Sequence, residues 1–403
     1  MPVNLDIIPA IAPKVVRPRV RRWLIFWAFL LLTGAVATLW FWKNEHTGMA
    51  FWFTAAVVPT AVWGVLFSLR RISYKCDQIW AASWNEERNQ LLEDETLRGQ
   101  RHLWLHGCAS LTTLGKNTGA LVSAVLKNTP LMSSSVPRTG GATVRHTRLG
   151  NEHSTVPELL LECRSVLSVR MNSLLDALPA EMPCYVLLDI HVDSNPAVNA
   201  AAAQEFRGVF SRPLRQINGS GLAALDSWTD MTWGIPSALL IVSTQINASP
   251  TNNSGEAAAA MLLTNCPSPA DPQAVHIHRP ERGSAGMLSK TMSRALLWAK
   301  AAPASVTQAW LTGGNLLTDS GWSTACETNA LALNIQKQCG FIDNITGFTG
   351  VAAPWLAYIT AATQCREDGI TQAVAVQTAT DEIWVGCVSA PASDVKDIQD
   401  SSL

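Results

Sequence analysis

Two apolar stretches near the start of the chain have the length of membrane-spanning helices. Residues 23–42 read WLIFWAFLLLTGAVATLWFW without a charged side chain, and residues 51–69 form a second apolar run that contains Pro59. A helix needs about 20 apolar residues to cross a bilayer. A cleaved signal peptide has a shorter apolar core and no second span behind it. We therefore expect a transmembrane hairpin, in preference to a signal peptide or to a buried helical hairpin of a soluble protein.

Basic residues are concentrated outside the two apolar stretches rather than between them. Lys14 and four arginines lie in the N-terminal segment 1–22, and three more basic residues lie within 70–75. The connecting loop has only Lys43, which is offset by Glu45. Positive charge favours the cytoplasmic side of a membrane. We therefore expect both ends of the hairpin, and everything after residue 70, in the cytoplasm.

Beyond the hairpin, the spacing of apolar residues predicts a helix and then an α/β domain. Residues 70–100 are polar and helix-prone, so we interpret them as a helical stalk or, alternatively, as the first surface helix of the domain. Over residues 101–390, strand-like runs such as CYVLLDIHV alternate with helix-like runs such as PELLLECRSVLSVRMNSLLDAL. This alternation predicts sheets covered by helices.

The α/β region divides into halves, about 101–265 and 266–390, with a similar order of elements. Two polar, turn-rich tracts, at residues 130–147 and 247–255, predict surface loops. The polar tail 391–403 predicts a disordered end.

Composition narrows the classes of function. The formal net charge is −1, and no basic face with interleaved aromatics is evident, so we expect no nucleic-acid partner. The nine cysteines are scattered and never form a C-x-x-C pair, which predicts reduced thiols rather than disulfides or a zinc site. Neither a G-x-x-x-x-G-K-[ST] nor a G-x-G-x-x-G sequence occurs, so a bound nucleotide cofactor has no support.

A few titratable residues have spacings that a functional site could use. His276 and His278 alternate on a predicted strand and so share a face, and His102 and His106 flank the first strand of the α/β region. Two histidines can begin a metal site, but a solvated strand face is the favoured interpretation. Asp189 and Asp193 stand at a strand end, where they could bind a metal or act as acid and base. Turn formation is the more frequent role of Asp at such ends.

Four stretches, taken in order, resemble the thiolase-like fold, and within it the β-ketoacyl synthases that condense acyl chains. LHGCASLTTLGKNTGALVSAVLKN (105–128) is similar to the opening strand and turn of that family, and INGSGLAALDSWTDMTWGIPSALLIVSTQ (217–245) to its nucleophile elbow, helix and following strand. SGEAAAAMLLTN (254–265) is similar to a hairpin strand, and residues 316–363 to the two catalytic histidine loops. The resemblance covers about 101–390 and implies duplicated α-β-α-β-α layers. It places the catalytic cysteine position in the first half and the two catalytic histidine positions in the second half.

The resemblance also implies that the chemistry has been lost. The family's elbow, T-A-C-x-S-G-L, corresponds to Gln216–Leu222 and places Asn218 at the nucleophilic cysteine. The first histidine loop places Ser320 at its histidine, and the second places Phe348 at the other. An amide cannot form the thioester, so acyl transfer would have no attacking group there.

Cys326, in GWSTACETN (321–329), stands apart from these three positions. The STAC sequence looks like an elbow, but it falls within the histidine-loop region, in the other half of the α/β region and about 100 residues after the elbow. A reactive thiol needs an electropositive, partly exposed setting and a base. We expect Cys326 to be a structural thiol, with a relocated nucleophile as the alternative.

The resemblance thus implies a membrane-anchored pseudoenzyme without cofactor or metal. Degenerate proteins of this kind occur with bacterial type VI secretion genes, which implies a scaffold or adaptor at the inner membrane, with a secretion effector or spike component as its protein partner. Active members of the family are mostly dimers, so a homodimer is expected. Two alternatives remain: a membrane-associated acyltransferase that uses Cys326, and a non-catalytic sensor that binds an acyl chain.

Overall fold

The computed structural model describes residues 3–41, 48–192, 195–268, 271–314, 316 and 320–391. Asp193, the loop with Lys43 and Glu45, and the tail from residue 392 lie outside the described residues. The chain divides into two compact units. The first, here called the hairpin unit, is residues 4–95, and the second, the α/β unit, is residues 96–403 with residues 1–3.

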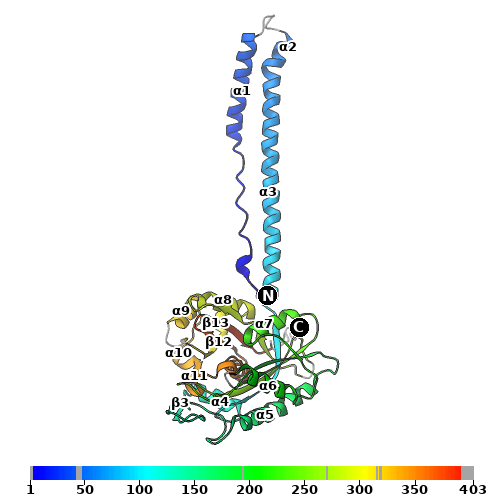
Figure 1. The fold of residues 1–403 in the computed structure, drawn as a ribbon. Coiled ribbons are helices and arrows are strands. Elements are labelled where there is room, and N and C mark those ends of the chain that lie inside the picture. Colours follow the sequence, from blue (N-terminus) through cyan, green and yellow to red (C-terminus); the bar gives the residue numbers. More distant parts are fainter. Residues whose placement is uncertain are drawn as a thin grey trace, which may run out of the picture. The chain divides into compact units, whose positions relative to one another are not determined.

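The hairpin unit contains two helices that are long and apolar enough to cross a membrane (Figure 1). Helix α1 is Val20–Phe41; α2 (Met49–Trp52) and a π-helical turn (Phe53–Val57) lead into α3, Val58–Gly99. The π-helical turn ends two residues before Pro59, whose missing N–H cannot join a regular helical ladder. The expected stalk, residues 70–100, is thus the continuation of the second apolar helix and not a separate element.

Aromatic contacts hold α1 against α3. Trp23 of α1 meets Phe67 of α3 edge-on at 5.5 Å between ring centroids, and within α3 the ring of Trp63 stacks on Phe67 at 5.2 Å. The indole Nε1 of Trp63 donates a 2.7 Å hydrogen bond to the carbonyl of Trp23. Gly34 faces the ring of Pro59 so closely that any Cβ there would collide with it. A small residue at this crossing lets the two backbones approach each other.

Over the described part of the chain, the α/β unit is built on one 11-stranded sheet with a repeated topology. The spatial order in the first half is β5-β4-β6-β7-β1, and in the second half β11-β10-β12-β13-β8. Both halves therefore place their own five strands in the order 3-2-4-5-1. In each, the second strand pairs in parallel with the third and fourth, and the fourth pairs antiparallel with the fifth. Strands β1 and β8 join the halves as an antiparallel pair. The duplicated fold that the sequence predicted is confirmed.

The elements of the α/β unit follow the predicted alternation of strands and helices. Its strands are β1 His102–Leu111, β2 Ser133–Ser135, β3 Val144–His146, β4 Cys184–His191, β5 Arg215–Gln216, β6 Ala238–Gln245, β7 Ala257–Thr264, β8 Val275–His278, β9 Glu281–Gly283, β10 Val306–Thr312, β11 Cys339–Phe341, β12 Thr371–Ala379 and β13 Glu382–Ser389. Its α-helices are α4 Thr118–Leu126, α5 Val156–Asp176, α6 Pro196–Arg207, α7 Gly221–Met231, α8 Leu288–Ala299, α9 Gly321–Thr328, α10 Ile335–Gln338, α11 Ile342–Thr346 and α12 Ala353–Asp368.

Three apolar clusters give this unit five layers. Successive strand residues point to opposite faces, and in β6 Leu239 and Ile241 belong to a central cluster while Leu240 and Val242 belong to an outer one. The central cluster combines α4, α7 and α12 with both half-sheets, whereas α5 and α6 cover one outer face and α8 and α9 the other. Helix α12 is buried around its whole circumference from residue 353 to 362. The order is therefore helix, sheet, helix, sheet, helix.

Two details differ from the sequence prediction. Residues 130–147, predicted to be a surface loop, contain the short β2–β3 ladder, whose strands pair from Ser133 with His146 to Ser135 with Val144. Strand β10 and helix α8 did not stand out in the sequence. Residues 307 and 308 of β10 are polar and only partly buried, so the apolar pattern of that strand is weak at its start.

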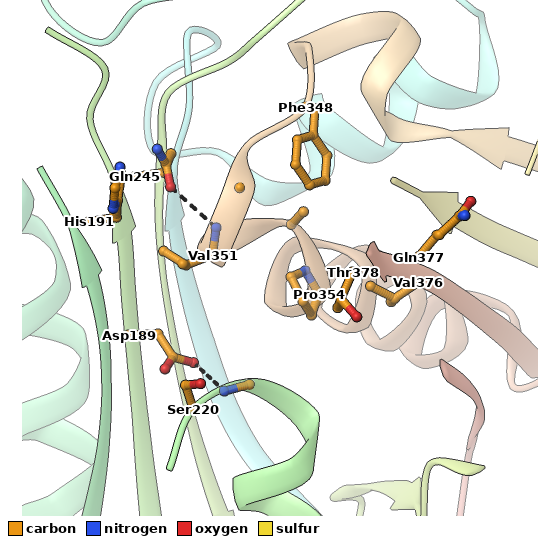
Figure 2. Close-up of a pocket in the computed structure, with 13 residues that line it drawn as sticks. Asp189, His191, Ser220, Gln245, Phe348, Val351, Pro354, Val376, Gln377 and Thr378 are labelled. Atoms are coloured by element: carbon orange, nitrogen blue, oxygen red, sulfur yellow. Dashed lines mark hydrogen bonds between the residues drawn. The ribbon is translucent and has the colours of Figure 1, made fainter. Parts of the chain in front are cut away.

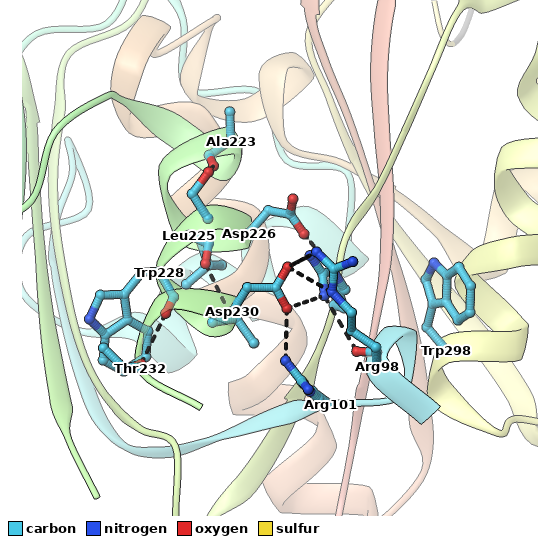
Figure 3. A network of polar contacts seen from close by, with 12 residues as sticks. Arg98, Arg101, Ala223, Leu225, Asp226, Trp228, Asp230, Thr232 and Trp298 are labelled. Carbon is cyan, nitrogen blue, oxygen red and sulfur yellow. Dashed lines mark hydrogen bonds and ion pairs between the residues drawn. The ribbon is translucent and has the colours of Figure 1, made fainter. Parts of the chain in front are cut away.

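Within the α/β unit, a cluster of ion pairs connects the last turn of α3, from residue 96 on, to α7 (Figure 3). Asp230 of α7 accepts hydrogen bonds from Arg98 at 2.5 Å, Arg101 at 3.0 Å and Arg279 at 2.9 Å. The side chain of Arg279 is 2% exposed and also bonds Asp226 at 2.5 Å. Burial opposes ionisation of Asp230, but its bonds from Arg279 and Arg98 outweigh it and hold its pKa well below the usual range.

We predict that Asp230→Asn lowers the unfolding free energy by about 3 kcal/mol, because it leaves the buried guanidinium of Arg279 with one anionic partner. The measurement is thermal unfolding of the full-length protein in detergent. Glu205→Gln, which removes the exposed ion pair between Arg164 and Glu205, is the matched control and should cost less than about 1 kcal/mol. Equal losses in the two variants would contradict the prediction.

Candidate functional site

A pocket of about 460 Å³ lies where strands β4, β6 and β12 end (Figure 2). Its lining comes from both halves of the α/β unit: Asp189, His191, Ser220, Gly221, Gln245, Phe348, Gly350, Val351, Ala353, Pro354, Val376, Gln377 and Thr378. The carboxyl ends of parallel strands are where α/β sheets usually bind ligands. Both half-sheets thus direct their strand ends toward one pocket.

Asp189 is the buried charged group of this pocket. Its Oδ2 accepts the backbone N–H of Gly221 at 3.0 Å and the indole N–H of Trp355 at 3.1 Å. Gly221 is the first residue of α7, so the carboxylate takes the place that the helix dipole offers to an anion. Burial raises the pKa of Asp189 to about 6, against the lowering effect of these two hydrogen bonds. Asp189 thereby ties β4, α7 and α12 together.

The loop before α12 forms the opposite wall. Gln245, at the end of β6, accepts the backbone N–H of Val351 at 3.2 Å (Figure 2). Phe348 is 39% exposed and lines both this pocket and a neighbouring one, so its ring separates two hollows. Gly347 has φ +71°, and a Cβ there would collide with the backbone of Ser254. Glycine is required at this position by the loop geometry, whatever chemistry the loop performs.

The structure brings together only part of the predicted site. Asn218 is exposed in the turn between β5 and α7, next to the pocket residues Ser220 and Gly221. Ser320 is exposed at the start of α9, eight residues beyond the end of β10. Within the described residues, the pocket lining includes Phe348 but neither Asn218 nor Ser320. Thr318 and Asp319, in the same loop as Ser320, lie outside the described residues.

Cys326 lies away from this pocket, in the apolar cluster beneath α8 and α9. It is 4% exposed, and burial raises the pKa of its thiol to about 12. A thiol with such a pKa is protonated at neutral pH and is a poor nucleophile. Cys163, Cys365 and Cys387 are also buried, and burial likewise raises the pKa of each to about 12.

The histidines gather elsewhere, on the β1–β8 pair. His102 and His276 lie 4.5 Å apart between ring centroids, and His276 and His278 lie 6.4 Å apart on one face of β8. Burial lowers the pKa of His276 to about 4 and that of His278 to about 3. His106 instead bonds Thr264 at 2.8 Å. Among the described residues, no group of three or more His, Cys, Asp or Glu side chains has a metal-binding arrangement.

Sequence reasoning missed a second buried carboxyl group, Asp343 of α11. It accepts hydrogen bonds from the Thr312 hydroxyl and the Gly313 N–H, both at 2.6 Å, at the end of β10. Burial raises its pKa to about 6. In both halves a carboxylate therefore links the end of the second strand to the helix after the third. No sequence motif marks this role of Asp343. His191 and Gln245 line the pocket, but their positions at strand ends were the only sign of this in the sequence.

We predict that Asp189→Asn becomes relatively more stabilising as the pH rises. The folded-state pKa of Asp189, about 6, lies above the 3.8 of an unperturbed aspartate side chain. The native state therefore binds this proton more tightly, and ionisation destabilises it as pH rises from 4 through 6. The Tm of the variant minus that of the wild type should increase by about 5 °C between pH 4.5 and 7. Scanning calorimetry measures the difference, with Glu367→Gln as the charge-loss control; a flat or falling difference would contradict the raised pKa.

Known structures share this fold. The oxazolomycin ketosynthase domain OzmH KS7 of Streptomyces albus JA3453 has 12% sequence identity and a TM-score of 0.55, over 72% of this chain and 75% of that one. The ishigamide ketosynthase/chain length factor has 13% identity and a TM-score of 0.50, over 72% of this chain and 99% of that one. The PfaC keto synthase–chain length factor has 10% identity and a TM-score of 0.50, over 73% of this chain and 43% of that one.

No family model matches the sequence, and no curated protein matches it. At 10–13% identity, the likeness to these ketosynthases is one of fold. It agrees with the strand order that both halves repeat and with the five layers. The α/β unit therefore has the thiolase-like fold of the ketosynthases.

Proposed function

We propose that this protein is a non-catalytic thiolase-like protein that acts as a membrane-anchored scaffold or adaptor. The observation that carries the proposal is the bond between the Asp189 carboxylate and the Gly221 N–H. In a condensing enzyme of this fold, the start of this helix would stabilise a thiolate and an acyl oxyanion. Here a buried anion occupies that amide, and a second negative charge beside it would be disfavoured.

The candidate nucleophiles support the same proposal. Asn218 stands at the position of the family's cysteine, and an amide cannot form a thioester. The described lining of the pocket contains no cysteine. Cys326 is the alternative nucleophile, but its buried and protonated thiol lies in a different layer. A condensing enzyme that relied on Cys326 would therefore lack an activated nucleophile.

The proposed partner is a protein. Two helices of the hairpin unit are apolar and long enough for anchoring, and we propose the inner membrane of a bacterium as their site. The resemblance to degenerate proteins of type VI secretion clusters favours a secretion effector or a spike component as the partner. A homodimeric arrangement of the α/β unit belongs to the same proposal. Co-purification from the membrane fraction, followed by identification of stoichiometric partners, tests this part.

We predict that acyl-CoA and malonyl-CoA form no stoichiometric covalent adduct with the full-length, folded protein. Intact-mass spectrometry is the measurement. In the same sample, a short iodoacetamide pulse should leave Cys326 unmodified, because its thiol is buried and protonated. An acyl adduct that disappears in Cys326→Ser would overturn the scaffold proposal and make the protein an acyltransferase.

A second candidate function, an acyl-chain sensor, is favoured by the pocket itself. A volume of about 460 Å³ lies in the range of small-molecule sites. Phe348, Pro354, Val351 and Val376 supply apolar walls, while Asp189 and the glutamines provide polar groups. Such a protein would bind an acyl chain without transferring it.

For this candidate we predict that octanoyl-CoA binds the full-length protein and that Thr378→Trp weakens binding about tenfold or more, because the indole fills the pocket. Isothermal titration calorimetry in detergent measures the affinity. Thr380→Trp, in the exposed turn outside the pocket lining, is the matched control and should leave the affinity unchanged. No binding to the wild type would exclude the sensor and leave the scaffold.

A further inference from the structure

Helix α3 has one face that the rest of the hairpin unit covers. In its first part, Trp63 and Phe67 contact Trp23 of α1. In its later part, an extended N-terminal arm runs along the helix: Trp84 and Arg88 donate to the carbonyls of Ala10 and Pro9, at 3.1 and 2.8 Å. Asn85 also accepts the N–H of Ala12 at 2.9 Å. Contacts within the chain thus cover this side of α3.

The opposite face carries an apolar stripe without such cover, here called the seam. Its residues are separated by alternating steps of four and three: Val58, Val62, Val65, Leu69, Ile72, Cys76 and Ile79. The six aliphatic side chains are between 43% and 65% exposed, and Cys76 is exposed as well. Steps of four and three place all seven on one line along the helix, in the d and a positions of a heptad repeat.

The later half of the seam lies beyond the second apolar run of the sequence. Residues 58–69 lie within the second apolar run, where lipid alone could cover them. Ile72, Cys76 and Ile79 follow the charged pair Arg70 and Arg71, beyond that run. Ile72 and Ile79 are each more than half exposed and continue the register of the apolar positions before them. Exposing such an apolar patch to water is unfavourable.

We propose that the seam joins α3 to the α3 of further copies of this chain, in parallel and in register. A heptad stripe is self-complementary, because the same a and d side chains meet across a parallel pair. Copies that are anchored in one bilayer by the same hairpin have the same orientation. Their α3 helices would therefore associate in parallel. β-branched residues at the d positions 58, 65, 72 and 79 favour small bundles of more than two strands.

The residues that flank the seam fit a parallel neighbour. Lys75 is at a g position and Trp80, 57% exposed, is at the e position that follows. In parallel coiled coils a g residue meets the next e residue of the neighbouring helix, so the ammonium of Lys75 would lie over the neighbour's indole. Arg70, Arg71 and Asp77 occupy b and c positions, away from the neighbour. Like charges of two copies are thereby kept apart.

The seam also has a defined end. The next a and d positions are Ser83 and Glu86, and both are exposed. Two Glu86 carboxylates at a d position would repel each other, so close contact should stop after Ile79. The proposed contact covers 22 residues from Val58 to Ile79, or about 33 Å of helix. This proposal does not depend on whether the α/β unit is catalytic.

Cys76 makes the proposal testable with the natural sequence. At an a position, two such thiols come within the Cα separation of about 4.4–6.8 Å that a disulfide requires. We expect copper–phenanthroline to cross-link the full-length protein in its native membranes to a dimer on a non-reducing gel. Cys76→Ser should abolish the band. In that background, Ile72→Cys at a d position should restore it, whereas the matched control Gln78→Cys, at a c position on the exposed side, should not.

A second set of variants tests the apolar contact itself. With Cys76 retained, the pair Ile72→Asn and Ile79→Asn should reduce cross-linking about tenfold or more, because it removes two buried side chains per copy. Leu91→Asn, an exposed leucine outside the seam, should leave it unchanged. Absence of the Cys76 dimer while a maleimide labels that thiol, or equal cross-linking at residues 72 and 78, would overturn the proposal. An adduct between Cys76 and a different polypeptide would also overturn it and assign the seam to another protein.

Discussion

The arrangement of the α/β unit depends on one buried carboxyl group. Asp189 ends β4, accepts the first N–H of α7 and is held by Trp355 of α12, the helix that both half-sheets enclose. Desolvation makes the ionised form costly, and the two hydrogen bonds together with the helix terminus offset part of that cost. A strand, a helix start and the central helix are thereby fixed relative to one another. The shape of the pocket between the strand ends follows from this contact.

In the second half, a different carboxylate makes the equivalent link between a strand end and a helix. Asp343 belongs to the helix after the third strand and reaches back to Thr312 and Gly313 at the end of the second. In the first half the carboxylate is on the strand and the amide on the helix; in the second half the roles are exchanged. Duplicated folds keep the spatial relation between elements, and more than one pair of side chains can satisfy it. The two halves thus keep the same relation between elements with different side chains.

A polar cluster and an apolar surface have different roles in this molecule. The cluster around Asp230 pairs buried charges and fixes the last turn of α3 to α7 and to Arg279, so its members are interdependent. The seam on α3 carries almost no charge and gains nothing within a single chain. Exposed apolar residues in heptad register are costly in water, and the proposed association with a neighbour of the same periodicity would cover them. The hairpin unit would then supply association as well as anchorage.

The sequence by itself determined the features that local periodicity encodes. Uncharged runs of about 20 residues marked both long apolar helices, strand and helix periods marked most of the α/β elements, and the order of four stretches indicated the thiolase-like fold. The heptad of the seam was present in the sequence too, but only the structure showed that the opposite face is covered and this one bare. Tertiary structure alone decided which residues meet at the pocket: Asp189, which lines it, is held by Trp355, 166 positions away, and nothing local relates the two. It also left Ser320 exposed at the start of a helix and placed Cys326 in an apolar core. The burial of a side chain and the pKa of a thiol depend on packing between distant segments, and not on the residues that are adjacent in sequence.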